Sequence, residues 1–351
     1  MPPIISRQQG FTLIELMVAI AIGLLMLAGL SSLFLGNNQA QMDIERANRQ
    51  VENGRYAMQL MTGDVRNAGF YAEFDPAILP APAAPPNPCS TVIADIGSAI
   101  ALPVQGYDDS NPIGCLSDVK ANTDIVVVRH THTCVVGAAD CDPATEGGPF
   151  FQASLCNNTY ELGSADLSRH YQVSAAATGF TLHRRDCDLT EGSGTPADLR
   201  RLVTHIYFIA NNSLAGDGVP TLKRAEVVSK NGQVSVVIVP LAEGIENMQA
   251  EYGIDISNDG VADLYATDAA TANGCGDNTC AVTNWSNVVA LKLHLLSRTL
   301  SPSMTHVDTK SYVLGMGADG KPNVIPAAKD KYKRHVFTSL IGLPNVAGRK
   351  T

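Results

Sequence analysis

The sequence is poor in basic side chains, with 25 Lys and Arg against 34 Asp and Glu among 351 residues and a formal net charge of −9. This acidic balance disfavours a protein that binds nucleic acid through a basic patch, so we expect no nucleic acid among its partners. The 30 glycines follow no three-residue period, which excludes a collagenous chain. The hydrophobic share of 45% excludes both a fully disordered chain and a polytopic membrane protein.

The sequence also lacks the signatures of several enzyme classes. It contains no G-x-S-x-G elbow, no H-E-x-x-H zinc motif and no Walker loop. Ser, His and Asp are plentiful, but the sequence alone does not show which of them meet in space. We therefore expect no enzymatic activity.

A long apolar run, residues 11–35, follows a short leader, residues 1–10, whose only charged side chain is Arg7. At a rise of about 1.5 Å per residue, this run forms a helix of roughly 37 Å, long enough to cross a bilayer. No convincing cleavage site of small residues follows Leu35, so we do not expect the run to be removed. Glu15 is the exception within it, because an ionised carboxylate in hydrocarbon costs several kcal/mol unless it is paired, shallow or neutralised.

Gly10, the following FTLIE (residues 11–15) and the apolar run together resemble the type III signal of type IV pilins and pseudopilins. The resemblance implies that a prepilin peptidase cuts after Gly10 and that Phe11 becomes the N-methylated new terminus. It also implies that Glu15 pairs with the N-terminal amine of a neighbouring subunit, which is the partner that a buried carboxylate needs. The alternative is an uncleaved single-pass anchor, with Glu15 near the interface at a favourable helix N-terminus.

Beyond the apolar run, an amphipathic helix is predicted over residues 36–70. Apolar or small side chains recur there at steps of three and four, with charged residues off that line. Gly54 and Gly63 weaken a free-standing coiled coil, so we expect this helix to pack on a globular domain. A proline-rich linker, residues 71–88, should follow. The stripe consists of Ile44, Ala47, Val51, Gly54, Met58, Met61, Val65 and Ala68.

Residues 89–351 alternate strand-like runs with segments rich in Gly, Ser, Asn and Asp, which is typical of an antiparallel sheet with long loops. The expected fold class is therefore α+β and like that of a type IV pilin: a long N-terminal helix, transmembrane and then amphipathic, packed on a mainly antiparallel head. The predicted strands cover residues 124–130, 179–184, 202–210, 227–228, 234–239, 248–254 and 288–296.

Three parts of the chain resemble PilW-type minor pilins. They are VENGRYA with DVRNAGF (residues 51–70), LAEGIENMQ before YGID (241–255), and WSNVVA with LLSR (285–298). The family ends in a basic-aromatic run and an Arg-Asn pair, and residues 333–345 keep them only in part. The position of the last strand is therefore not predicted. The resemblance implies a role in starting pilus assembly and a tip complex with other minor pilins and an adhesin.

The resemblance also implies further partners and a location. The partners are the prepilin peptidase, the major pilin and other minor pilins. The chain would be a single-pass protein of the inner membrane with a periplasmic head, and later part of the extracellular pilus. Residues 71–351 are bulky to repeat along a filament, which favours the tip over a bulk subunit. The alternatives are a minor pseudopilin of a type II secretion system that contacts exported proteins, or a tip adhesin or DNA-uptake subunit.

All eight cysteines lie beyond the apolar run, in the part expected in the oxidising periplasm. An even number scattered through loops indicates disulfides, although eight cysteines allow many connectivities. Short loops are easy to close, so pairing by sequence proximity is favoured. The preferred pairs are Cys275 with Cys280 and Cys134 with Cys141, followed by Cys89 with Cys115 and Cys156 with Cys187.

Oxygen-bearing side chains in residues 255–263 have the spacing of a calcium-binding loop, with Gly260 at the sixth position, where the turn is sharp. Ala266 replaces the acidic ligand expected at the twelfth position, although Asp268 could substitute for it. The alternative to a Ca²⁺ site is a plain turn, because the N-D-G of residues 258–260 is a strong turn sequence. The candidate ligands are Asp255, Ser257, Asp259 and Asp263.

His130, His132 and Cys134 alternate along a predicted strand, so their side chains would share one face in a geometry that permits Zn²⁺. The oxidising compartment and the lack of an obvious fourth ligand argue against zinc. The favoured interpretation is a polar strand face that ends in a disulfide.

Overall fold

The structure, a computed structural model, describes residues 10–141, 143–144 and 146–350. The predicted leader, residues 1–10, lies outside the described residues except for Gly10. The chain divides into two compact units, Met1–Arg49 and Gln50–Thr351. This division falls inside the predicted amphipathic segment, residues 36–70.

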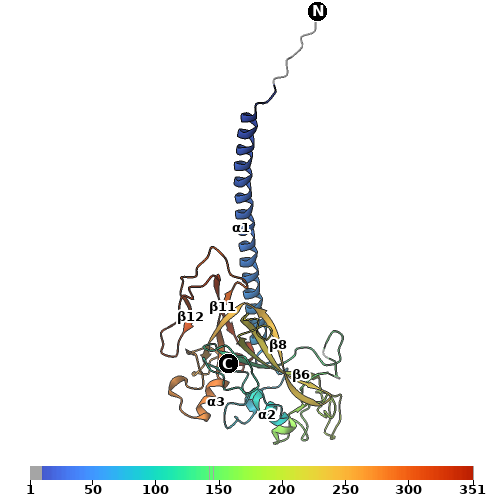
Figure 1. Cartoon of the computed structure of the whole chain (residues 1–351). Helices are drawn as coiled ribbons and strands as arrows, with labels where there is room; N and C mark the ends of the chain where they lie inside the picture. Colours follow the sequence, from blue (N-terminus) through green and yellow to red (C-terminus); the bar gives the residue numbers. More distant parts are fainter. Residues whose placement is uncertain (1–9, 142, 145, 351) are drawn as a thin grey trace, which may run out of the picture. The chain divides into compact units, whose positions relative to one another are not determined.

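One long helix, α1 (Leu13–Asn67), covers nearly all of the predicted membrane segment, residues 11–35, and most of the predicted amphipathic segment, residues 36–70 (Figure 1). By length and composition, α1 is able to cross a membrane. Almost all its side chains before residue 36 are exposed. Exposed apolar surface of this extent marks a region that lipid or other subunits cover.

Residues 50–67 of α1 bury one face in the head. The buried positions are three or four residues apart, as one face of a helix requires. The predicted stripe is right at Gly54, Met61, Val65 and Ala68, whereas Ile44 and Val51 are exposed and Met58 is only half-buried. The buried residues in this part of the helix are Gln50, Gly54, Ala57, Met61 and Val65.

Two glycines set how α1 meets the head. A Cβ atom at Gly54 would lie 2.1 Å from Cε2 of Phe337, so only glycine lets the helix approach this ring. Gly69 follows the helix with a φ of +76°, a left-handed conformation that commonly ends helices. Its N–H donates to the carbonyl of Arg129 at 2.9 Å, which ties the end of the helix to the head.

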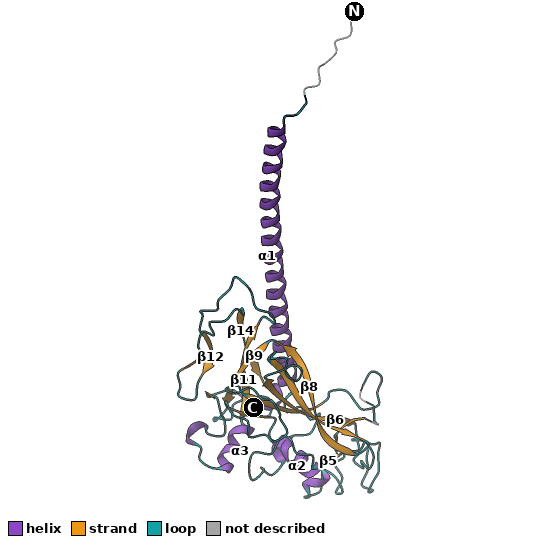
Figure 2. Ribbon diagram, in the orientation of Figure 1, coloured by secondary structure: helices purple, strands orange, loops and turns teal. Residues whose placement is uncertain are grey.

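The described part of the head contains two main antiparallel sheets and a hairpin, arranged around the last turns of α1 (Figure 2). The eight-stranded sheet follows the order β1-β2-β6-β4-β5, with β7 also paired to β6, and with β3 and β8 paired to β7. Its strands are β1 (Val104–Tyr107), β2 (Ile125–Thr131), β3 (Glu146–Gly148), β4 (Phe150–Ala153), β5 (Tyr171–Ser174), β6 (Leu199–Ala210), β7 (Thr221–Lys230) and β8 (Gln233–Glu243).

The second sheet has the order β10-β9-β11-β14, and a separate hairpin pairs β12 with β13. The last strand, which the sequence leaves open, is β14, paired along β11 from Arg334 to Gly342. The bounds are β9 (Ile245–Ile254), β10 (Leu264–Ala266), β11 (Val288–Arg298), β12 (Tyr312–Met316), β13 (Pro322–Ile325) and β14 (Arg334–Gly342).

Short helices complete the head. The α-helices are α2 (Ile93–Ser98), α3 (Asn278–Ser286) and α4 (Pro344–Ala347), and the 3₁₀ turns are η1 (Pro76–Ile78), η2 (Ala99–Ala101), η3 (Leu167–Arg169) and η4 (Ala272–Gly274).

The largest hydrophobic cluster joins α1 to strands of both main sheets. Met61 and Val65 of α1 pack there with Tyr207 of β6 and Tyr252 of β9. The single tryptophan, Trp285, is 1% exposed and packs edge-on against Tyr252, with ring centroids 4.7 Å apart. Burial of apolar area, at about 25 cal/mol per Å², therefore fixes the C-terminal part of α1 to the head.

The predicted linker, residues 71–88, is only partly a linker. Its start contributes to the core, because Tyr71 is fully buried and Phe74 is 5% exposed, both packed near Phe151 of β4. Because these rings can bury large apolar areas, they attach the chain to the head directly after α1. The prolines follow from residue 76 onwards.

One predicted strand is wrong, and one glycine-rich run belongs to a hairpin. The predicted strand 179–184 is absent from the described structure, where His183 makes a single bridge with Pro196. The run Gly315–Gly320 has the spacing G-x-G-x-x-G, but it begins at the end of β12 and continues into the turn before β13. A dinucleotide-binding loop needs a helix after its glycines, so this run is a hairpin turn.

The structure joins the cysteines into four disulfides. They are Cys89–Cys115, Cys134–Cys141, Cys156–Cys187 and Cys275–Cys280, the pairs that sequence proximity favours. Each closes a loop of the head, so the bonds restrain irregular segments and leave the strands to form the core.

Candidate functional site

The predicted peptidase site lies at the start of the described chain. Gly10 and Phe11 precede α1 in exposed, non-helical chain, and 91% of Phe11 is accessible. A peptide bond outside regular structure is open to a protease. The geometry of this segment thus suits cleavage between Gly10 and Phe11.

Glu15 and Thr12 form a reciprocal cap at the start of α1. The Oε2 atom of Glu15 accepts the N–H of Thr12 at 2.9 Å and its hydroxyl at 2.8 Å, while the Thr12 hydroxyl accepts the N–H of Glu15 at 3.4 Å. This is a capping box, and the sequence signal that reveals it is T-x-x-E. The carboxylate that the signal places in the apolar segment therefore also stabilises the first helical turn.

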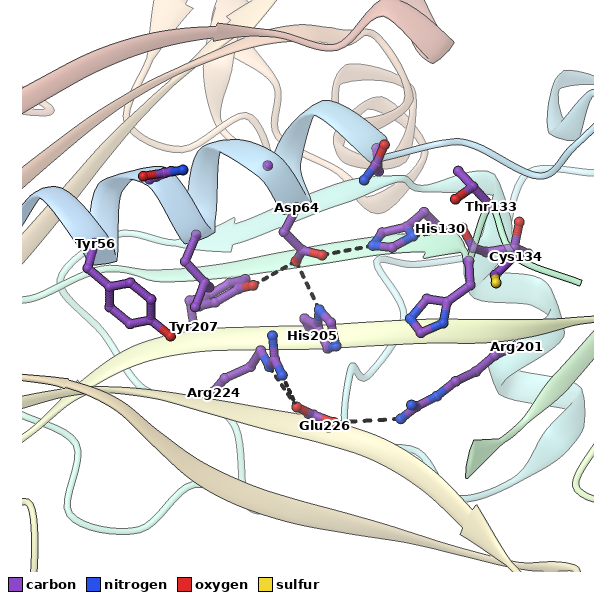
Figure 3. A pocket seen from close by; sticks show the side chains of 16 residues that line it. Tyr56, Asp64, His130, Thr133, Cys134, Arg201, His205, Tyr207, Arg224 and Glu226 are labelled. Carbon is purple, nitrogen blue, oxygen red and sulfur yellow. Dashed lines mark hydrogen bonds and ion pairs between the residues drawn. The ribbon is translucent and has the colours of Figure 1, made fainter. Parts of the chain in front are cut away.

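The head contains a polar cavity of about 700 Å³ between the last turns of α1 and strands β2, β6 and β7 (Figure 3). Helix α1 supplies Asp64, and the strands supply the side chains that face it. The polar lining includes Tyr56, Asp64, His130, His132, Arg201, His205, Tyr207, Arg224 and Glu226.

Asp64 lines this cavity, and three side chains converge on its carboxylate in Figure 3. Nε2 of His130 lies 2.8 Å from Oδ1, and Nδ1 of His205 lies 2.9 Å from Oδ2. The hydroxyl of Tyr207 donates to Oδ2 at 2.8 Å. One carboxylate thus links α1 to β2 and β6.

The charge of Asp64 is strongly favoured in this position. Burial alone would raise its pKa, but His205 and His130 hold the pKa of Asp64 well below its usual range. Burial, reinforced by the charge of Asp64, raises the pKa of Tyr207, so its hydroxyl keeps the proton that it donates. Asp64 is therefore an ionised acceptor at neutral pH.

Arginines border the cavity and have an acidic partner of their own. Nε of Arg224 donates to Oε1 of Glu226 at 2.7 Å, and Arg201 lies 3.6 Å from Oε2 of the same carboxylate. Glu226 thus offsets positive charge that would otherwise face Asp64.

The zinc site of His130, His132 and Cys134, which the sequence disfavours, does not form. Cys134 is bonded to Cys141, so it has no thiolate to offer, and His130 turns to Asp64. The Cys134–Cys141 disulfide is the interpretation that the sequence favours over zinc. The sequence does not reveal the actual cluster, because Asp64 is 66 residues from His130 and 141 residues from His205.

The predicted calcium loop holds a turn through its acidic side chains. Asp255 accepts the N–H groups of Asn258 at 2.6 Å and Gly260 at 2.8 Å. Asp263 accepts those of Ile256 at 2.6 Å and Ser257 at 2.8 Å. These bonds hold the backbone of the loop in a compact turn through the carboxylates of Asp255 and Asp263. Calcium binding by Asp255, Ser257, Asp259 and Asp263 stays a prediction.

Comparisons with known proteins agree with the N-terminal signal and with the PilW-like segments at residues 241–255 and 285–298. Residues 5–31 match the family model of the prokaryotic N-terminal methylation motif, and residues 206–345 match that of PilW, type IV pilus-assembly protein W. A comparison with curated proteins found no match.

Among solved structures, the chain is similar to the type IV-like pilin TTHA1219 from Thermus thermophilus. The similarity has 9% identity and a TM-score of 0.34, and covers 85% of this chain and 98% of that chain. The two family matches cover residues 5–31 and 206–345, and over these parts the chain is similar to a PilW-type type IV pilus-assembly protein with an N-terminal methylation motif.

Proposed function

We propose that this chain is a minor pilin that helps to start type IV pilus assembly and occupies the filament tip, with other minor pilins and an adhesin as neighbours. It acts as a structural component and not as an enzyme. The observation that carries the proposal is the size of the head: residues Gln50–Thr351 form one unit built around only the last turns of α1. A head of this size crowds its neighbours when repeated along a filament, whereas a single copy at the end does not.

Processing and location follow from the same proposal. A prepilin peptidase removes residues 1–10, and Phe11 becomes the methylated terminus. Arg7 in the leader favours a cytoplasmic N-terminus before cleavage, which places the head in the periplasm. The four disulfides of the head support this orientation, because such bonds persist in an oxidising compartment.

In the assembled pilus, Glu15 pairs with the N-terminal amine of a neighbouring subunit. Its Oε2 atom accepts both bonds from Thr12, but a carboxylate has several lone-pair sites and can also accept an amine. Charge neutralisation of this kind makes a carboxylate tolerable in an apolar filament core.

The test compares Glu15→Ala with Thr12→Ala. Both substitutions remove the capping box, at a cost of about 1 kcal/mol to the first helical turn, but only Glu15→Ala removes the charge. We expect both variants to remain in the membrane fraction, and only Glu15→Ala to be strongly depleted from sheared pili. Equal recovery of wild type and Glu15→Ala in sheared pili would contradict the assembly role of the carboxylate.

A further inference from the structure

The geometry of the cavity points to a second property of the head, separate from its role in the filament. We propose that Asp64, His130 and His205 bind one divalent transition-metal ion of the zinc type, which links α1 to β2 and β6.

The two ring nitrogens of His130 both face oxygen atoms that only accept hydrogen bonds. Nδ1 lies 2.9 Å from the carbonyl oxygen of Thr131, so this nitrogen carries a proton. In a neutral ring, Nε2 then presents a lone pair, yet it lies 2.8 Å from the carboxylate oxygen of Asp64. At 2.8 Å the two atoms form a hydrogen bond when a proton lies on Nε2, and they become a nitrogen and an oxygen ligand when a metal ion displaces that proton.

The bond from Nδ1–H to a backbone carbonyl is also what orients a metal-binding histidine. Such a bond fixes the tautomer, so the other ring nitrogen is free to bind the ion, and it raises the basicity of that nitrogen. Thr131 provides this carbonyl from β2 itself, so the ring of His130 is oriented before any ion arrives.

The second histidine completes a three-atom donor set. The ligand atoms of Asp64, His130 and His205 all lie within 4.8 Å of one another. Zinc binds nitrogen and oxygen ligands at about 2.0–2.2 Å, which places tetrahedral ligand atoms about 3.3 Å apart. The observed separations of 2.8 and 2.9 Å to Asp64 therefore need only small side-chain shifts to admit an ion.

The donor types select the metal. Two imidazole nitrogens with one carboxylate suit zinc and other transition metals, whereas Ca²⁺ and Mg²⁺ prefer oxygen ligands. Three protein ligands leave a fourth position, which water from the adjoining cavity of about 700 Å³ can fill. The hydroxyl of Tyr207 donates to Oδ2 of Asp64 and so holds the carboxylate in place.

The test uses the full-length chain, purified in detergent with its disulfides intact, stripped with a chelator and dialysed against Zn²⁺. Metal content by mass spectrometry should show one zinc per chain. The affinity of His205→Gln for zinc should be at least roughly tenfold lower than that of the wild type, because this substitution removes one of only three ligands. His335→Gln is the matched control, because His335 is an exposed histidine of β14.

A second control addresses another acidic group. The carboxylates of Asp108, Asp109 and Asp124 also lie within 4.8 Å of one another, and Asp109 is exposed. Asp109→Asn should leave zinc binding unchanged. Zinc that is lost in Asp109→Asn but kept in His205→Gln would overturn the proposal, as would a wild-type chain that binds no zinc.

Folding of the variant is checked by the fluorescence of Trp285. If His205→Gln does not fold, the wild-type chain loaded with Co²⁺ decides the question. An intense visible absorption, typical of tetrahedral cobalt, supports the assignment, and a weak octahedral spectrum overturns it.

Discussion

Replacing Arg334 with methionine should strongly destabilise the head, because this arginine is buried among acidic side chains. The side chain of Arg334 is 4% exposed and meets three carboxylates: Asp308 at 2.9 Å, Asp330 at 2.7 Å and Glu246 at 2.5 Å. Asp308 is only 1% exposed, so Arg334→Met leaves a buried charge without its cation. Removal of one partner from a buried ion pair costs about 3–5 kcal/mol in the free energy of unfolding.

The structure supplies the assay. Trp285 is the single tryptophan and is buried in the head, so its fluorescence during urea unfolding reports the head alone. A second substitution, Asp308→Asn, removes the buried charge that Arg334→Met leaves unpaired, so it should restore part of the stability of Arg334→Met. Arg334→Lys keeps the charge but loses the bidentate geometry of the guanidinium group, so it should reduce the stability by an intermediate amount. A loss below about 1 kcal/mol in Arg334→Met, the value of a surface pair, would refute the reasoning.

The ion pairs of Arg334 also predict that the stability of the head depends on pH. Hydrogen bonding to Arg334 lowers the pKa of Asp330 against the opposing effect of burial. A carboxylate whose folded pKa is depressed adds stability above its unfolded pKa of about 3.9, and this contribution is lost as the pH falls through the folded pKa. The stability difference between wild type and Arg334→Met should therefore narrow below about pH 4. A difference that is constant from pH 7 to strongly acidic pH would exclude Asp330 as a contributor.

Two further predictions concern α1 and the disulfides. Gly54→Ala should destabilise the head by about 1–3 kcal/mol because the new methyl group overlaps Phe337, whereas Gly63→Ala, with no described atom within 4 Å of the new Cβ, should stabilise it by up to about 1 kcal/mol. Equal urea midpoints for these two variants would contradict the close approach at Gly54. Replacing both Cys156 and Cys187 with alanine should cost about 2–4 kcal/mol, and an unchanged midpoint would show that this loop needs no restraint.

Local sequence patterns anticipate much of the fold. The β-branched run that becomes β2 and the alternation along β11 both encode strands, because burial in a pleated sheet selects such side chains. The helix stripe is approximate, since three- and four-residue steps fit Met58 and Ala57 almost equally well and only packing makes Ala57 the buried one. The strand expected at 179–184 does not form. The N–H of His183 donates to the carboxylate of Glu161 at 3.0 Å and not to the backbone of a neighbouring strand.

The polar sites are harder to predict, because they join residues that are distant in the sequence. The helix pattern places Asp64 off the apolar line, as a solvent-facing residue, yet its side chain is only 11% exposed and meets β2 and β6. Likewise, the basic run before Phe337 does not reveal that Arg334 forms ion pairs with Asp308 and Glu246. Charge alone does not distinguish a solvated residue from a paired one; only the tertiary arrangement does so.

Mass spectrometry of sheared native pili tests the central claim most directly. The account predicts that this chain begins at an N-methylated Phe11, without residues 1–10, and is present in only a few copies per filament relative to the major subunit. A chain that still begins at Met1, or one as abundant as the major subunit, would contradict the assignment as a processed minor pilin.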